Sequence, residues 1–221
     1  RLRDLTDQTR TVKPSPNLNL TYFMQRDVLG DDPLTPEIEP MEEAEFSLII
    51  DNVGYGEATN VNMVTQQPQI IDNEQGLLIN FEFTRALLNG EDETLAMGGD
   101  IATPFGDIAP KSQSYAQWFM TSTLMGHFTD YNVEATHVTS YDNPDLSLLN
   151  EVTIHELIRS VDVPGKDGMK GFICNDEKDD NNLPDIIYLT DGTKEPVGLC
   201  DKVSMEQIDD TNYRLTLVPS T

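Results

Sequence analysis

The chain has 221 residues, which is enough for one large or two modest domains, and its 38% apolar composition is sufficient to bury a core. Acidic residues dominate, with 39 Asp and Glu against 14 Lys and Arg and a formal net charge of -25. Because no basic stripe is present to contact phosphates, the sequence excludes nucleic acid as a partner. No apolar run approaches the roughly 20 residues that a membrane-spanning helix needs, so we expect no membrane insertion.

Residues 1–16 are polar and end in two prolines, which predicts a linker or an edge strand. Since the sequence begins at Arg1 and carries no signal peptide, we interpret it as a processed chain or a piece of a larger protein. From Asn17 onward, apolar residues alternate with polar ones in NLNLTYFM. This period of two is typical of a half-buried strand, and we take it as the first strand of the main domain.

The segment Phe46–Val64, FSLIIDNVGYGEATNVNMV, predicts two strands joined as a β-hairpin or at a strand corner. The first strand alternates until Asn52, and two glycines follow before the second strand begins. We expect the chain to turn there with positive φ angles at Asn52, Gly54 and Gly56, because these residues adopt such angles at low cost. The structural residues predicted for this corner are Asn52, Gly54, Gly56 and Asn60.

Further alternating runs predict strands at Gly76–Phe83, Ser112–Thr123 and Tyr131–Thr139. Between them, residues 86–94 and 97–112 contain Asn-Gly, Gly-Gly and two prolines, so we expect turns and loops there. Short strands at this spacing, without helices of ten or more residues between them, favour an all-β antiparallel sandwich over a parallel sheet.

The C-terminal part of the chain is harder to interpret. Apolar residues in 151–161 fit both a helix and an interrupted strand, and the β-branched residues favour the strand. Beyond Pro164 and Gly165, short apolar runs are separated by acidic or Asp-Gly turns. We therefore predict a sandwich domain over residues 17–163 and a smaller β unit over 166–221, which leans on the first domain or is truncated.

The two cysteines, Cys174 and Cys200, close a loop of moderate length and could form a disulfide in an oxidising compartment. Two buried free thiols fit the sequence equally well, because spacing alone does not fix the pairing.

An acidic stretch, NDEKDDNNLPD, offers hard oxygen ligands of the kind that calcium prefers. Its candidate ligands are Asp176, Asp179, Asp180 and Asp185. The spacing does not match an EF-hand, because the sixth position lacks glycine and the twelfth lacks glutamate. A solvated acidic loop is the favoured interpretation, and calcium is the one cofactor for which the sequence offers a candidate site.

Four aromatic residues are candidates for stacking on the apolar face of a sugar: Tyr55, Phe105, Tyr115 and Trp118. Trp118 lies in an alternating run, on the same side as Ala116 and Met120. We therefore favour core packing for Trp118 over ligand binding.

No motif in the sequence supports catalysis. His155-Glu156 resembles the start of a zinc-protease helix, but position 159 is Arg and the second histidine is missing. Convergence of His127, His137 and His155 on a metal is disfavoured, because no cysteine lies near them. The sequence contains no nucleophile elbow, P-loop or dinucleotide-binding fingerprint. We predict no catalytic residues and a protein that is not an enzyme.

The corner motif FSLIIDNVGYGEATNVNMV resembles the strand and Asn-x-Gly-x-Gly turn of CARDB-like and NPCBM-associated (NEW3/APHP) immunoglobulin-like domains of bacterial surface or secreted proteins. The runs SYAQWFMTSTLMGHFTDYNVEATHV, DLSLLNEVTIHELI and LPDIIYLTDGT resemble segments of large multidomain extracellular proteins, including those of gut Bacteroidetes. Together these segments cover about a third of the chain.

The resemblance implies an immunoglobulin-like β-sandwich without catalytic residues, located outside the cell or on its surface. Such a module would act as a spacer, adhesion or protein-interaction domain, with neighbouring domains of the parent protein, or a surface protein or glycan, as partners. The alternative function is that of a carbohydrate-binding accessory module.

Overall fold

The structure is a computed structural model that describes residues 13–31, 36–38, 40–66, 81–93, 100–123, 126–127, 148–176, 183–198 and 200–219. Within these residues the chain is all-β, as expected, and contains no helix. The strands are β1 (Leu18–Gln25), β2 (Asp27–Val28), β3 (Ala44–Asn52), β4 (Ala58–Gln66), β5 (Phe81–Leu88), β6 (Glu91–Glu93), β7 (Asp100–Ile108), β8 (Gln113–Ser122), β9 (Gly126–His127), β10 (Leu149–Asp162), β11 (Lys170–Cys174), β12 (Ile186–Leu189), β13 (Lys194–Pro196), β14 (Cys200–Gln207) and β15 (Tyr213–Pro219).

The strands predicted from Asn17, from Ser112 and over residues 151–161 are confirmed as β1, β8 and β10. The strand predicted at 131–139 lies outside the described residues. So does most of the one predicted at 76–83, and β5 is described from Phe81 onward.

Among the described residues, the largest sheet has nine strands in the order β13-β12-β11-β10-β1-β3-β8-β5-β6. The predicted antiparallel arrangement is wrong at one pair, because β1 and β10 run parallel, with Phe23 beside His155. The other neighbours in this sheet are antiparallel. A parallel pair requires a long connection, and β1 and β10 are far enough apart in the sequence to have one.

One face of the central strands β1, β3 and β8 packs against the two-stranded sheet of β4 and β7. Alternate residues of the central strands point to this face, so Leu20, Leu48 and Trp118 are almost completely buried. Phe105 of β7 belongs to the same core. The indole Nε1 of Trp118 donates to Thr103 Oγ1 at 3.1 Å, which satisfies its polar atom. Trp118 is a core residue, as the sequence favoured.

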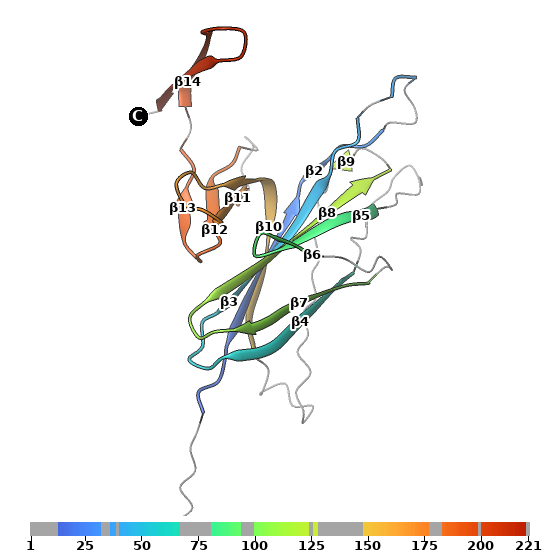
Figure 1. Cartoon of the computed structure of the whole chain (residues 1–221), viewed down its shortest axis with the longest axis vertical. Helices are drawn as coiled ribbons and strands as arrows, with labels where there is room; N and C mark the ends of the chain where they lie inside the picture. The colour runs from blue at the N-terminus through green and yellow to red at the C-terminus, as the bar shows by residue number, and fades with distance from the viewer. Residues whose placement is uncertain are drawn as a thin grey trace, which may run out of the picture.

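The opposite face of the central strands is buried as well, beneath β10, β11 and β12. Phe23 of β1 stacks on Phe172 of β11 with ring centroids 4.5 Å apart, and Tyr188 of β12 meets it edge-on at 5.3 Å. Strand β10 joins both parts, because its residues from Leu149 to Leu157 pair with β1 and those from Leu157 to Asp162 pair with β11. Figure 1 shows β11, β12 and β13 set to one side of the long strands. The stacked layers are consistent with a β-sandwich.

Residues 100–108 form β7, so the loop expected over 97–112 is wrong in this part. Gly106 has a φ of 70° opposite Val61, where the register with β4 shifts. Pro104 is exposed, and among the described residues its sheet has two strands, where a missing backbone donor is tolerated. Gly106 therefore lies at a β-bulge, and Pro104 lies on a strand that can lack one backbone hydrogen bond.

The turn expected within residues 86–94 is confirmed at Asn89 and Gly90, which have φ angles of 51° and 85°. Two successive residues with positive φ form the turn type that suits a two-residue β-hairpin. The flanking residues belong to strands β5 and β6, which pair directly across this turn.

The boundary predicted at Pro164 and Gly165 lies in a turn between two paired strands of one sheet, β10 and β11. This turn also contacts β8, because the Tyr115 hydroxyl donates to the carbonyl oxygen of Gly168 at 3.2 Å. Strands β11 to β13 thus extend the main sheet. Among the described strands after Gly165, β14 and β15 form a separate hairpin, in which every strand residue is exposed, and Figure 1 shows it apart from the other strands.

Candidate functional site

The corner after β3 is organised by Asn52, whose side chain is completely buried and bonds only to backbone groups. Its Oδ1 accepts hydrogen bonds from the backbone N–H groups of Asn17 at 3.2 Å and Gly54 at 3.1 Å. The two N–H groups of its Nδ2 are shared among three carbonyl oxygens, those of Gly56 at 2.8 Å, Ile108 at 3.1 Å and Ala109 at 3.1 Å. One amide therefore joins the segment before β1, the corner itself and the end of β7.

The positive φ angles predicted for this corner are wrong at Asn52, Gly54 and Gly56, and only Asn60 has one, at 54°. The glycines are needed because the backbone before β1 passes directly over them. A Cβ atom on Gly54 would lie 2.4 Å from the nitrogen of Asn17, and one on Gly56 would lie 2.1 Å from the carbonyl oxygen of Pro14. Close approach of two backbones, and not chain reversal, therefore requires glycine here.

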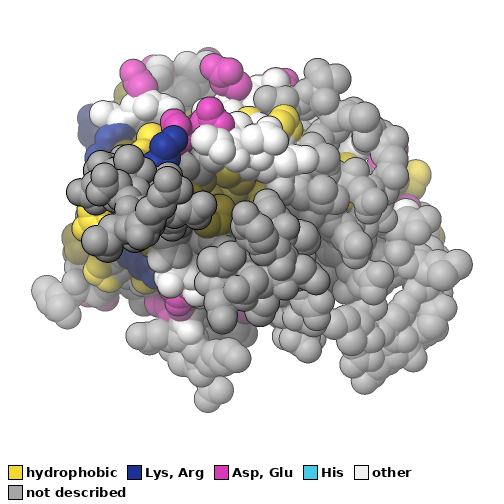
Figure 2. Space-filling model, turned by 90° about the horizontal axis from the view of Figure 1, so that it is seen from below, with side chains coloured by type: hydrophobic (Ala, Val, Ile, Leu, Met, Phe, Trp, Pro, Cys, Tyr) yellow, Lys and Arg dark blue, Asp and Glu magenta, His cyan; other side chains and the backbone are white. Residues whose placement is uncertain are grey.

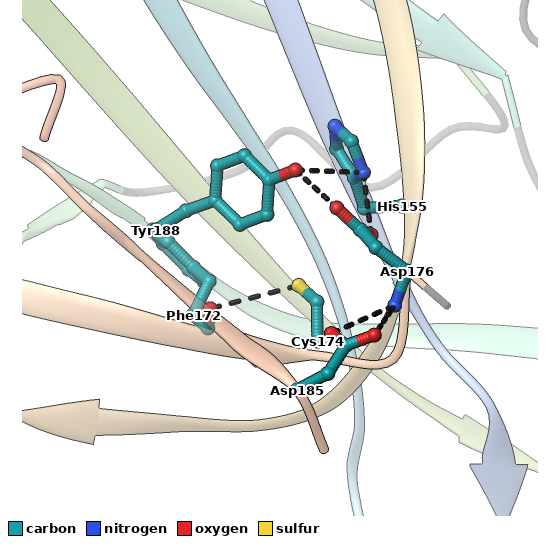
Figure 3. Close-up of polar contacts among 6 residues, drawn as sticks. All are labelled: His155, Phe172, Cys174, Asp176, Asp185 and Tyr188. Carbon is teal, nitrogen blue, oxygen red and sulfur yellow. Dashed lines mark hydrogen bonds and ion pairs between the residues drawn. The ribbon is translucent and has the colours of Figure 1, made fainter. Parts of the chain in front are cut away.

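A second polar cluster connects β10, β11 and β12 and is drawn in Figure 3. Asp176 follows β11, and its Oδ1 lies 2.8 Å from Nδ1 of His155 on β10. The Tyr188 hydroxyl on β12 donates to the other oxygen of the same carboxylate and lies 3.2 Å from His155 Nδ1. The backbone N–H of Asp176 donates to both carboxylate oxygens of Asp185, at 3.0 and 3.1 Å. These bonds fix both ends of the acidic segment that begins after β11.

Burial and hydrogen bonding act in opposite directions on Asp176. Partial burial raises the pKa of its carboxyl group, but the hydrogen bonds from His155 and Tyr188 stabilise the charged form and leave the pKa below its usual value. For Tyr188, burial and then the bond to Asp176 both raise the pKa of the phenol. The tyrosine therefore stays protonated and acts as a donor to the carboxylate.

Burial limits the chemistry that this cluster could perform, because a substrate could not reach its reactive atoms. A His-Asp pair can orient an imidazole as a base, with Nδ1 held and Nε2 turned toward a substrate. Here Nε2 of His155 is buried and has no hydrogen-bond partner. The nearby thiol of Cys174 is fully buried, and burial followed by the surrounding carboxylates raises its pKa, which disfavours the reactive thiolate. The cluster holds Asp176 against β10 and β12.

A third cluster, which the sequence did not indicate, surrounds the buried carboxylate of Glu45 on β3. Its Oε1 accepts hydrogen bonds from Ser47 Oγ at 2.6 Å and Gln117 Nε2 at 2.7 Å. Its Oε2 accepts a bond from Ser160 Oγ on β10. Polar residues at alternate positions of a strand normally indicate a face in water. The layer formed by β10 covers that face, and no local signal reveals this.

The four calcium candidates are only partly described. Asp179 and Asp180 lie outside the described residues. Both oxygens of Asp176 accept hydrogen bonds, and Asp185 caps the Asp176 backbone. Among the described residues, no group of three His, Cys, Asp or Glu side chains is arranged to hold a metal ion. A calcium site in this segment stays a prediction from the sequence.

Of the four aromatic candidates for sugar stacking, Phe105, Tyr115 and Trp118 are buried and Tyr55 is 76% exposed. Tyr55 lies at the tip of the corner, and the Lys111 ammonium sits 4.2 Å from its ring centroid. The face of this ring is thus already occupied by a cation. The structure does not bring the four aromatics together into one platform.

Cys174 and Cys200 are both free, the first buried on β11 and the second exposed at the start of β14. The disulfide that the sequence allowed is therefore not formed in this structure. The alternative of two buried thiols is also incomplete, because only Cys174 is buried.

Acidic side chains are scattered over the face drawn in Figure 2, among polar and hydrophobic groups and a few basic ones. On that face, the described basic side chains do not line up into a stripe. Over the part of the chain that the structure describes, there is also no helix long and apolar enough to cross a bilayer.

Comparison with known proteins gave no assignment. No family model matches the chain, and neither the curated proteins nor the solved structures include a significant match.

Proposed function

We propose that the chain is a non-catalytic extracellular module of a larger surface or secreted protein, which acts as a spacer and interaction domain. The observation that carries this proposal is the course of the chain in Figure 1. The segment before β1 lies at one end of the long axis, and the β14–β15 hairpin lies at the other. A module with this geometry holds whatever is attached at its two ends a fixed distance apart.

The use of its polar side chains supports a mechanical function. Asn52 fastens the segment before β1 to the corner, and the cluster of His155, Asp176 and Tyr188 fastens the segment after β11. The bond from Asn52 to Gly56 is buried and resists local opening, because breaking it leaves unsatisfied groups, whereas the other bonds are partly buried or exposed and contribute less. These connections hold the segment before β1 and the residue Asp176 after β11 in place, and none of them involves the β14–β15 hairpin.

We infer an immunoglobulin-like arrangement as the finer fold. In immunoglobulin constant-type domains, one sheet has the strand order A-B-E-D. The order β1-β3-β8-β5 follows this pattern if β8 is strand E, and β4 then corresponds to strand C in the facing sheet. The extra strand β7 and the parallel β1–β10 pair depart from the constant-type pattern.

The spacer function can be tested with spin labels at the two ends. Native Cys200 is exposed and takes one label, Ser15→Cys supplies the second, and Cys174 is buried. Position 15 is held in place, because the Gly56 N–H donates to its carbonyl oxygen at 3.1 Å. Double electron–electron resonance on labelled protein diluted with unlabelled protein should give one narrow distance distribution. A broad distribution in native protein would refute the rigid spacer, and urea-unfolded protein supplies the control for breadth.

The carbohydrate-binding alternative is tested separately on a glycan array. The spacer proposal predicts no specific retention of any glycan. Specific retention that Tyr55→Ala abolishes would replace the proposal with a sugar-binding function, because Tyr55 is the exposed aromatic among the four candidates.

A further inference from the structure

The buried cluster around Glu45 brings together a carboxylate, a hydroxyl group and an amide, which are the groups that an acyl transfer requires. Oε1 of Glu45 accepts hydrogen bonds from Ser47 Oγ at 2.6 Å and from Gln117 Nε2 at 2.7 Å. The other carboxylate oxygen accepts a bond from Ser160 Oγ. Because all three partners are donors, the carboxylate is in its charged, acceptor-only form. It can therefore take a proton from a hydroxyl group.

The amide of Gln117 is only half satisfied. Its Nε2 donates to Glu45, but its Oε1 is buried and has no hydrogen-bond partner among the described residues. An unpaired buried amide oxygen costs free energy. An ester carbonyl oxygen is a weaker acceptor than an amide oxygen, so conversion of this amide to an ester reduces that cost.

The surroundings of the cluster are dry. Ser47 and Gln117 are almost completely buried and lie opposite each other on β3 and β8. The next pair on the same face, Ile49 and Tyr115, belongs to the second hydrophobic core. Phe23 of β1 lies beside Ser47 and belongs to the same core. Burial of this kind keeps water from competing with a hydroxyl nucleophile and from hydrolysing an ester.

We propose that Ser47 and Gln117 form an ester cross-link between β3 and β8, made by the chain itself with Glu45 as the proton carrier. Ser47 Oγ attacks Cδ of Gln117 while Oε1 of Glu45 takes the hydroxyl proton. Glu45 then gives this proton to Nε2, the Cδ–Nε2 bond breaks, and ammonia leaves. The new Oγ–Cδ bond remains, nothing is oxidised or reduced, and Glu45 returns to its starting form.

Two observations select Ser47 over Ser160 as the nucleophile. The hydroxyl of Ser47 and the leaving nitrogen of Gln117 contact the same oxygen of Glu45, so one atom can accept the proton and pass it on. Residues directly opposite on antiparallel strands have Cβ atoms about 4.5–5.5 Å apart, a separation that a Ser–Gln ester spans. Ser160 contacts the other oxygen and lies on β10, which does not pair with β8.

This inference goes beyond the spacer function and does not depend on it. The reaction happens once within the chain and acts on no external substrate, so it is compatible with a module that is not an enzyme. The bond would hold β3 and β8 together when the ends of the chain are pulled apart, because separating the strands would then require breaking a covalent link.

Mass spectrometry of the folded full chain, after prolonged incubation at neutral pH, tests the proposal. The intact mass should be lower by one ammonia. Trypsin cuts after Arg85 and Lys111, which separate Ser47 from Gln117 in the sequence, so the peptides 27–85 and 112–159 should remain joined. Mild hydroxylamine should separate them, because it cleaves an ester and leaves peptide bonds intact.

Ser47→Ala and Glu45→Gln should each keep the full mass and give separate peptides, because the first lacks the nucleophile and the second lacks the base. Ser114→Ala is the matched control and should cross-link like wild type. Ser114 is also a buried serine, but its hydroxyl donates to the amide oxygen of Asn89 instead of a carboxylate. Native Trp118 fluorescence would show that each variant is folded.

Three results would overturn the proposal. The first is folded wild-type protein that keeps its full mass and gives separate peptides. The second is loss of ammonia without joined peptides, as ring closure at Asn89-Gly90 would produce. The third is a cross-link that persists in Ser47→Ala or joins 112–159 to 160–166, because Ser160 would then be the nucleophile.

Discussion

Replacing Asn52 with alanine is the sharpest test of how the corner is held. The substitution removes an amide that bonds to the backbone of three segments, while it changes neither the strand pattern nor the apolar core. Of its hydrogen bonds, those to the carbonyl oxygens of Gly56 and Ile108 and from the N–H of Gly54 are buried. The other two, which involve Asn17 and Ala109, are partly buried.

The magnitude follows from these bonds. Each buried hydrogen bond should contribute about 1 kcal/mol to the free energy of unfolding. Each partly buried bond should contribute about half of that, because water partly replaces the lost partner. Their sum predicts that Asn52→Ala lowers the free energy of unfolding by about 3 to 5 kcal/mol. This is a large share of the roughly 5–15 kcal/mol that a domain usually has.

Urea unfolding followed by the fluorescence of Trp118 measures this change, since Trp118 is the only tryptophan and is fully buried in the native state. Asn150→Ala is the control. Its Nδ2 makes one exposed bond to Asn19 at 2.8 Å, and its removal should change the stability by less than about 0.5 kcal/mol.

Asn52→Asp tests the contribution of the side-chain N–H donors separately from that of the side-chain oxygen acceptor. The aspartate keeps the two bonds that Oδ1 accepts but directs a charged oxygen at three carbonyl groups. The penalty should be largest at neutral pH and shrink as the pH falls, because protonation removes the charge. A loss below about 1 kcal/mol for Asn52→Ala, with an unchanged denaturant slope, would refute the proposed role of the amide.

Three further predictions concern single positions. Gly56→Ala should lower the melting temperature although the φ angle of Gly56 is not positive, because the added Cβ would lie 2.1 Å from a backbone oxygen. Gly198→Ala is the control and should leave the melting temperature unchanged, because open space surrounds Gly198. Equal effects of the two substitutions would contradict the close-approach explanation. The lowered pKa of Asp176 means that its charged form stabilises the fold above the unfolded pKa of about 3.9. This stabilisation is lost as the pH falls through the pKa of the folded state. The difference in unfolding free energy between wild type and Asp176→Asn should therefore be present at pH 7 and vanish in acid. A thiol reagent should modify Cys200 in native protein and Cys174 only after unfolding; two fast thiols, or none, would contradict the thiol states described above.

Much of the fold could be predicted because its signals are local. The alternation in Leu18–Gln25 and Gln113–Ser122 gave the strands and one buried face, and Asn89-Gly90 gave a hairpin turn. Residues 100–108 were missed because Pro104 and Gly106 are loop signals in most contexts. They are compatible with a strand here because, among the described residues, β7 pairs with one neighbour, β4, through an irregular register.

The polar clusters could be predicted less well. Asp176 was noted for its charge, but its bonds to His155 and Tyr188 depend on the side-by-side placement of β10, β11 and β12. Glu45 and Gln117 are polar and lie on strands, where alternation alone gives no sign that the structure buries them.

The sequence by itself determined that the protein is all-β, which residues of the central strands face a core, and where the chain turns after β3. These features follow from a period of two and from turn residues, which act over a few positions. Only the tertiary structure decided that the second face of the central strands is covered, and that the backbone before β1 packs against Gly54 and Gly56. It also left every residue of β14 and β15 exposed. Such contacts join residues far apart in the chain, and no local pattern specifies which distant segment comes to lie against a given face.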